Sequence, residues 1–260
     1  MAHVGVLRAL LENDIRIDCI AGTSAGAIVA GAFAAGMSIQ EIADVGRKLR
    51  WRNIGRMTMS RLGIQSNERL EQYLRERLPI TKFEDMPMPF ATIATDLNTG
   101  EAVVMKDEGD VPFAIRASCT IPGWYVPVLD QEGRQLVDGG LVGVVPSSVT
   151  RSLGADVVIA IDVNTEGATF ITPSSSVIGV LLQAMMVVQK TASSYQLEMS
   201  DFVISPKVGH IRWDQMGRAD ELMEAGYKAG VESIPELRAL ISADRLVKSV
   251  SSVVPEFLSH

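Results

Sequence analysis

The sequence predicts a single α/β domain with a mostly parallel central sheet and helices on both of its faces. Segments with helical spacing of apolar residues alternate with short apolar runs along the 260 residues, which is the pattern of this class. Hydrophobic residues make up 47% of the chain but aromatic residues only 5%. Such a composition is typical of helices packed on a parallel sheet. We expect one domain over residues 1–245 and a C-terminal tail over residues 246–260.

The first half of the chain alternates between helix-type and strand-type patterns. Residues 3–14 have helical spacing and end at Asn-Asp, whereas residues 17–22 are strand-like and are closed by a glycine. Further helices are expected over 24–36, 38–50, 67–78 and 111–120, and two strands, joined by an Asn-Thr-Gly turn, over 90–97 and 101–108.

The second half is expected to begin with another hairpin and to end in two helices separated by Pro235. The run 155–163 is continuously apolar, as in a strand buried on both faces. The remaining expected elements are the hairpin over 125–140, a Met-rich helix over 176–199, a strand over 201–206, the closing helices over 218–241 and a mobile surface loop over 165–176.

Charge and hydropathy exclude several functional classes. The formal net charge is −7, so no basic surface supports binding to nucleic acid. Charged residues are scattered through residues 1–18, where a secretory signal needs an apolar run. Of the two most hydrophobic windows, 19–40 consists of small residues and 176–189 is too short to cross a bilayer. We expect a cytoplasmic protein, with peripheral membrane contact left open, in which Cys19 and Cys119 are buried free thiols.

A Gly-x-Ser-x-Gly pattern is formed by Gly22, Thr23, Ser24, Ala25 and Gly26. A strand-like run precedes it and a helix-like run follows it, which is the context of a nucleophile elbow. The serine would then lie at a helix N-terminus, where free N–H groups stabilise negative charge. Side chains at the two flanking glycines would clash with strand and helix. The alternative is a small-residue helix in which Ser24 is an ordinary N-cap.

A nucleophilic serine needs a base, and the chain has three histidines. The order Ser24, Asp138, His210 matches that of α/β-hydrolases, but that fold places several strands before its nucleophile and 23 residues cannot supply them. His210 lies in a polar, turn-like stretch and is expected to be solvated. His3 begins the first helix and His260 is the last residue, and neither has a predicted role.

A carboxylate is the other candidate for the base. Asp138 ends a strand-like run and is followed by Gly139 and Gly140. Glycines beside a carboxylate open backbone space and would leave it accessible. The plain alternative is an Asp-Gly β-turn, which is common.

The elbow and the Asp-Gly-Gly motif together resemble the bacterial patatin-like phospholipases. The likeness runs from Ala2 to about Ile241, and the resemblance implies a patatin-like three-layer domain over residues 1–245. The segments that carry it, in order, are "AHVGVLRALLE", "IAGTSAGAIVAGAFAAG", "PFATIATDLNTGE", "IRASCTIPGWYVPV", "LVDGGLV", "GADVVIAIDV" and "ADELMEAGYKAG".

The resemblance implies a serine acyl hydrolase of the phospholipase A or lysophospholipase type, with a Ser-Asp dyad and no histidine. Ser24 would attack an ester carbonyl to give an acyl-enzyme, and Asp138 would take its proton and later help to activate water. The implied substrates are lipid acyl esters, and the resemblance implies neither a metal nor a cofactor. The alternative is a catalytically impaired member that binds lipid or regulates other proteins.

Two features depart from the family pattern. Family members carry a glycine-rich oxyanion loop after a first strand, just before the helix that begins Ala-His-Val-Gly. The sequence contains no such loop before Met1, so we expect the true start to lie upstream and residues 1–260 alone to be nearly inactive and poorly stable. In addition, Gly143 and Val144 stand where the family usually has Asn-Pro. We therefore expect the loop that carries Asp138 to be less restrained.

Three segments are candidates for membrane contact. Trp124 and Tyr125 would form an interfacial anchor or, equally, would line the core or a pocket. The Met-rich run 180–190 favours core packing over a lipid groove. The loop over 165–180 is the third candidate.

Overall fold

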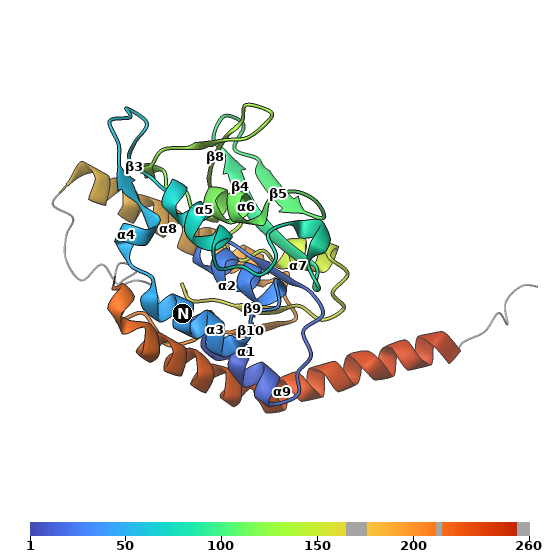
Figure 1. Cartoon of the computed structure of the whole chain (residues 1–260). Coiled ribbons are helices and arrows are strands. Elements are labelled where there is room, and N and C mark those ends of the chain that lie inside the picture. The colour runs from blue at the N-terminus through green and yellow to red at the C-terminus, as the bar shows by residue number, and fades with distance from the viewer. Residues whose placement is uncertain (165–175, 212–214, 254–260) are drawn as a thin grey trace, which may run out of the picture.

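The structure, a computed structural model, describes residues 1–164, 176–211 and 215–253 (Figure 1). The helices are α1 (Ala2–Glu12), α2 (Ala25–Ala34), α3 (Ile39–Lys48), α4 (Trp51–Ile54), α5 (Glu68–Arg75), α6 (Val111–Ser118), α7 (Ser147–Ser152), α8 (Val177–Leu197) and α9 (Ala219–Val253), with short 3₁₀ turns η1 (Phe83–Asp85), η2 (Gly139–Leu141) and η3 (Met216–Arg218). The strands are β1 (Ile20–Gly22), β2 (Arg56–Met57), β3 (Gly63–Ser66), β4 (Phe90–Asp96), β5 (Ala102–Lys106), β6 (Gly123–Tyr125), β7 (Val128–Leu129), β8 (Gln135–Asp138), β9 (Ile159–Ile161) and β10 (Phe202–Ile204). The predicted loop over 165–176 lies outside the described residues, apart from its last residue.

The central sheet is organised around β4, all of whose residues are buried. β1 pairs parallel with residues 90–92 of β4, and β8 pairs antiparallel with residues 94–96. Because β5 pairs with residues 91–95, it occupies one edge of β4, and β1 and β8 must share the other. The carboxyl ends of β1 and β8 therefore meet at the middle of β4.

The α/β class is confirmed, but the expectation of a mostly parallel central sheet is wrong. The pairing β1–β4 is parallel, whereas β4–β5, β4–β8 and β7–β8 are antiparallel. The predicted hairpins account for β4–β5 and β7–β8, because strands joined by a tight turn run antiparallel, and the long-range pairing of β8 with β4 adds the third antiparallel pair. The parallel pair β9–β10 forms a separate sheet, and β2, β3 and β6 form a third.

The main core packs α2 and α6 against β4. Phe83 stacks on Phe90 of β4 with ring centroids 5.5 Å apart. Ala27 and Ala30 of α2 and Ile115 of α6 are buried in the same cluster. The small residues of α2 therefore let this helix lie close to the sheet and fix the position of its N-terminus.

The helix α9 differs from the two closing helices that Pro235 predicts. It is one helix from Ala219 to Val253 with Pro235 inside it, and Figure 1 shows it as a long, bent helix. Proline removes one hydrogen bond and typically kinks a helix. Here Ile234 and Leu237 on either side of the proline are buried in one cluster, so packing holds the chain helical through the kink. The predicted boundary at residues 245/246 falls inside this helix, and the division into domain and tail stays a prediction.

The helix α1 packs on α9 without room for a side chain at Gly5. A Cβ placed on Gly5 would overlap the carbonyl oxygen of Met223. Beside this contact, the guanidinium of Arg8 lies 4.6 Å from the ring centroid of Tyr227, whose hydroxyl donates a 2.7 Å hydrogen bond to Glu12. The pairing of α1 with α9 thus depends on backbone-to-backbone approach.

We expect Gly5→Ala to lower the free energy of unfolding by about 1–3 kcal/mol, because α1 and α9 must separate to admit the methyl group. Gly217→Ala is the matched control, since a Cβ there meets nothing within 4 Å. Urea denaturation of both variants checks this. Equal midpoints for the two variants would contradict the close contact.

Candidate active site

Ser24 lies in a strand–turn–helix segment between β1 and α2. Its backbone angles, φ 52° and ψ −121°, fall in a region that costs a non-glycine residue about 1–3 kcal/mol. Gly22 is required for this turn, because a Cβ there would lie 2.5 Å from the carbonyl oxygen of Gly26. A Cβ on Gly26 would meet only His3 Nε2, at 3.8 Å. The clash expected at both glycines therefore occurs only at Gly22.

The Ser24 hydroxyl donates a hydrogen bond of 2.7 Å to Oδ2 of Asp138. It makes no capping hydrogen bond to α2, so the alternative of an ordinary N-cap is wrong. The other carboxylate oxygen, Oδ1, accepts a 2.8 Å hydrogen bond from the N–H of Gly140. Asp138 is 3% exposed and Ser24 is half-buried, so the serine is the more accessible member of the pair.

Gly139 and Gly140 serve close packing around Asp138. A Cβ on Gly139 would overlap the carbonyl oxygen of Ile93 in β4. One on Gly140 would overlap the side-chain amide of Gln189 in α8. Both glycines are buried, so they do not leave the carboxylate accessible as their sequence pattern predicts.

Three hydroxyl-bearing residues that the sequence reasoning missed hold the pair in place. The N–H of Ser24 donates to Oγ of Ser118 at 2.9 Å. The N–H of Asp138 donates to the carbonyl of Thr120 at 2.8 Å, and the Thr95 hydroxyl donates to the carbonyl of Asp138 at 2.9 Å. Two of them, Ser118 and Thr120, could have been found from the sequence, because they come directly after the last apolar positions of α6.

Asn67, the residue directly before α5, holds the segment that contains Thr120 in place. Its side chain is fully buried and donates to the hydroxyl of Thr120 at 2.8 Å and to the carbonyl of Arg116 at 3.1 Å. Arg116 in turn donates from Nε to the side-chain oxygen Oδ1 of Asn67 at 3.0 Å. The segment that anchors Asp138 is therefore tied to the rest of the core.

The loop after Asp138 is restrained, although the departure from Asn-Pro predicted a freer one. The Thr23 hydroxyl, next to the nucleophile candidate, donates to the carbonyl of Gly143 at 2.6 Å. The side chain of Gln196 in α8 donates to the carbonyl of Val142 and accepts from the N–H of Val145, both at 2.9 Å. Side chains from the elbow and from α8 therefore restrain this loop, and a comparison with loops that carry Asn-Pro stays a prediction.

Burial shapes the acid–base chemistry of the site. It raises the pKa of Asp138 from 3.8 to about 6, against the opposing hydrogen bonds from Gly140 and Ser24. Burial and the nearby carboxylate also raise the pKa of the Cys119 thiol well above its ordinary value, so this thiol stays neutral beside Ser24. Cys119 is buried, Cys19 is half-buried, and both are free thiols.

The histidines do not reach Ser24 in the part of the chain that the structure describes. His210 is exposed, and its Nε2 lies 2.8 Å from a carboxylate oxygen of Glu221, as expected for a solvated residue. His3 lies beside Gly26 and makes no hydrogen bond to Ser24 among the described contacts. Burial lowers the pKa of His3 to about 3, with a smaller contribution from the N-terminal ammonium group. His260 lies outside the described residues.

The candidates for membrane contact fall in different surroundings. Tyr125 is 2% exposed and belongs to the main core, so it is no interfacial anchor, and Trp124 is half-buried. The expectation that residues 180–190 are core is wrong, because none of them is buried. The helix α8 contacts η2 and α7 along one side and leaves its other side uncovered by described residues.

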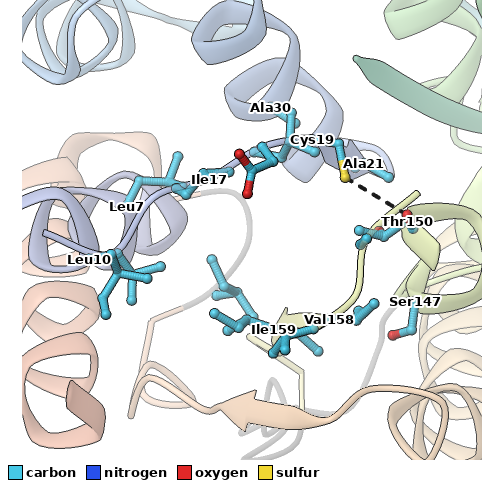
Figure 2. A pocket seen from close by; sticks show the side chains of 18 of the residues that line it. Leu7, Leu10, Ile17, Cys19, Ala21, Ala30, Ser147, Thr150, Val158 and Ile159 are labelled. Atoms are coloured by element: carbon cyan, nitrogen blue, oxygen red, sulfur yellow. Dashed lines mark hydrogen bonds between the residues drawn. The ribbon is translucent and has the colours of Figure 1, made fainter. Parts of the chain in front are cut away.

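A cavity of about 930 Å³ lies between β1 and β9 (Figure 2). Among the described residues, β1 pairs only with β4 and β9 only with β10, so each strand has an unpaired edge. The cavity extends to Thr23, directly before Ser24. Figure 2 shows its lining side chains from both sides, including Leu7, Leu10, Ile17, Cys19, Ala21, Val158 and Ile159.

The family profile described as patatin-like phospholipase matches residues 1–150. The chain belongs to this family. A patatin-like phospholipase domain-containing protein 7 from Rattus norvegicus is 31% identical over 269 residues, which cover 88% of this chain and 19% of the rat protein. An uncharacterized NTE family protein of Mycobacterium tuberculosis is 37% identical over 166 residues, covering 63% of this chain and 45% of that protein.

The fold is also that of a solved patatin-family neighbour. VipD from Legionella pneumophila aligns with a TM-score of 0.53 and 14% identity, covering 90% of this chain and 64% of that chain, so it supports the fold alone. The chain spans less than half the length of these curated relatives. No helix in the described part of this patatin-like chain is long and apolar enough to cross a membrane. The described residues contain no cluster of three or more metal-ligating side chains.

We expect Asp138→Asn to stabilise the fold. With its pKa raised from 3.8 to about 6, the ionised carboxylate is less stable in the folded chain than in the unfolded one. The resulting loss in free energy of unfolding is small below about pH 4, grows between about pH 4 and 6, and reaches its full size above about pH 6. A difference of about 2 pKa units corresponds to about 3 kcal/mol. The variant should therefore gain up to about 3 kcal/mol in free energy of unfolding at about pH 8.

Urea denaturation of Asp138→Asn and of the unmodified chain at about pH 8 and about pH 4 measures the gain. The gain should be much smaller at the lower pH, where the carboxyl is protonated in the folded state and only partly ionised in the unfolded state. An equal effect at both pH values, or destabilisation at the higher one, would contradict the cost assigned to the buried charge.

Proposed function

We propose that this chain is a serine carboxylester hydrolase that cleaves acyl esters of lipids such as phospholipids and lysophospholipids. The observation that carries the proposal is the 2.7 Å hydrogen bond from the Ser24 hydroxyl to Asp138 at a strained strand-to-helix turn. Membership of the patatin-like phospholipase family supports a lipid substrate. The family name alone does not say which ester bond of a lipid is cleaved.

In the acylation step, Ser24 Oγ attacks the ester carbonyl carbon while Asp138 Oδ2 accepts its proton. The tetrahedral intermediate collapses as the ester C–O bond breaks and the proton passes to the leaving alcohol. In deacylation, water loses a proton to the same carboxylate and attacks the acyl carbon, which releases the fatty acid and restores the Ser24 hydroxyl. Atoms and charges balance with the ester and water as the only reactants.

The pKa of about 6 suits Asp138 for this work. A carboxylate with an ordinary pKa is a weak base, whereas one raised toward neutrality accepts a proton more readily and is still ionised at pH 7. The hydrogen bond from Gly140 to Oδ1 leaves Oδ2 for the serine. Ser24 also lies at the N-terminus of α2, whose dipole favours negative charge on the attacking oxygen.

We propose that the hydrogen-bond donors to the oxyanion are carried by a segment in extended conformation, which would fill the cavity between β1 and β9. The support is that both strands have an unpaired edge there and that the cavity extends to Thr23. A strand in this position would deliver its following loop beside Ser24, and the backbone N–H groups of a glycine-rich loop are suitable donors.

We expect Ser24→Ala and Asp138→Asn each to reduce hydrolysis of a p-nitrophenyl ester by at least about 100-fold, because each removes one half of the dyad. A fluorophosphonate probe should label the unmodified chain and not Ser24→Ala. Ser233→Ala, at another half-buried serine, is the control and should keep both rate and labelling. The rate should rise with pH up to about 6 and then level off, as Asp138 ionises. Labelling that survives Ser24→Ala would refute the assignment of the nucleophile.

We expect a chain extended before Met1 by a strand-forming run and a Gly-Gly-Gly-x-Arg-Gly loop to be about 10²–10³ times faster than residues 1–260, because the loop supplies oxyanion donors. The control carries the same strand followed by a Gly-Ser linker that is not expected to hold its N–H groups in place. Stopped-flow hydrolysis of the same ester measures the difference. Equal rates for the short and extended chains would exclude this location for the donors.

A further inference from the structure

We propose that the β2–β3 hairpin and the outer side of α8 form a docking surface for an anionic phospholipid bilayer. The inference deepens the proposed function and rests on it, since it describes how a lipid substrate would reach Ser24 and Asp138.

The first observation is a run of cations in an acidic chain. Residues 45–67 contain no Asp or Glu, although the whole chain has a formal net charge of −7. Arg47 pairs with Asp44 and Asp220. In the described structure the other cations of this run are exposed and have no acidic partner within salt-bridge distance; they are Lys48, Arg50, Arg52, Arg56 and Arg61. Such a cluster favours a polyanionic surface.

The second observation is the apolar tip of the hairpin between these cations. Met57, Met59 and Leu62 are 68%, 103% and 57% exposed. Their side chains contribute little to the packing of the fold, and flexible methionines adapt to irregular apolar surroundings. Arg56 directly precedes Met57 and Arg61 directly precedes Leu62, so apolar and cationic groups are presented together, as in segments that bind at a bilayer interface.

The third observation is the apolar side of α8. Val177, Val180, Leu181, Val187 and Val188 are 54–77% exposed. Lys190 is the only charged residue between positions 177 and 197. Adjacent exposed apolar side chains of this kind mark an interaction surface rather than a solvated helix face.

The opposite side of α8 contacts the candidate active site. Gln196 hydrogen-bonds to both Val142 and Val145 in the loop after Asp138, and Gln189 packs against Gly140. A bilayer bound to the outer side of α8 would therefore lie within one helix diameter, about 10–12 Å, of the loop that carries Asp138.

A single flat surface can meet both elements. Figure 1 shows the loop between β2 and β3 and the N-terminal end of α8 projecting at the same end of the molecule. A plane laid against that end meets the β2–β3 loop and the N-terminal end of α8, which begins at Val177. The mixture of unpaired cations and exposed apolar side chains fits anionic lipid better than a neutral bilayer, because only the former uses both kinds of group.

The test is cosedimentation of the Ser24→Ala chain, which keeps the vesicles intact, with sucrose-loaded vesicles. Phosphatidylcholine mixed with phosphatidylglycerol is compared with phosphatidylcholine alone. We expect binding to the anionic vesicles only, weakened by salt. Arg56→Gln/Arg61→Gln should lower the partition coefficient at least about tenfold, since each cation near such a surface contributes about fivefold. Met59→Ser/Leu62→Ser and Val180→Ser/Val187→Ser should each lower it several-fold.

Lys207→Gln/Lys228→Gln is the matched control, because it makes the same change in net charge at exposed residues outside the surface. It should bind as the parent does. Equal binding by the parent and all surface variants, or an equal loss in the control, would overturn the proposal. So would equal binding to both kinds of vesicle.

Hydrolysis of a short, water-soluble ester separates this proposal from the proposed function. With Ser24 present, all surface variants should hydrolyse it at the parental rate. An ester hydrolysed by a chain that does not bind anionic vesicles would refute the docking surface alone. Binding without any Ser24-dependent hydrolysis by the chain that carries the Gly-Gly-Gly-x-Arg-Gly extension would refute the proposed function alone.

Discussion

The edge of β4 on which β1 and β8 meet is the constraint on which the candidate site depends. Gly22 pairs with Thr92 and Asp138 with Ala94, so the carboxyl ends of two oppositely directed strands are separated by two residues of β4. Two residues of a strand span about 7 Å, which the turn after Gly22 and the Asp138 side chain close to one hydrogen bond. Because side chains alternate between faces, a slip of β8 by one residue would point Asp138 away from Ser24.

The site combines three features that each lower the stability of the fold. Ser24 has a positive φ, Asp138 has a buried carboxyl group with a raised pKa, and the elbow has no room for a side chain at Gly22. The buried core around α2, α6 and β4 compensates for these costs. The N–H groups of Ser24 and Asp138 donate to the Ser118 hydroxyl and the Thr120 carbonyl, which fixes the backbone at both members of the pair. This preorganisation reduces the rearrangement that a reaction would require.

The class of fold and most helices could be predicted from the sequence because they depend on local patterns, whereas the pairing of Ser24 with Asp138 followed from the resemblance to patatin-like phospholipases. The Gly-x-Ser-x-Gly turn and the Asp-Gly-Gly turn each reflect steric limits within a few residues. The direction of the sheet could not be read in the same way, since the pairing of β8 with β4 joins segments about 40 residues apart. The closing helices were mispredicted because the packing of Ile234 and Leu237 overrides the local effect of Pro235.

The loop after Asp138 is held in place by contacts with other elements of the fold. Gly143 has no side chain with which to brace the loop, yet its carbonyl accepts from Thr23 at 2.6 Å and its N–H donates to Gly139 at 2.8 Å. A Cβ at this position would lie 2.9 Å from Cδ1 of Ile93, so the glycine also suits the close approach to β4. Side chains on the elbow and on α8, Thr23 and Gln196, restrain the loop from outside it. The geometry around Asp138 consequently depends on how the elbow and α8 are held, and not on the loop alone.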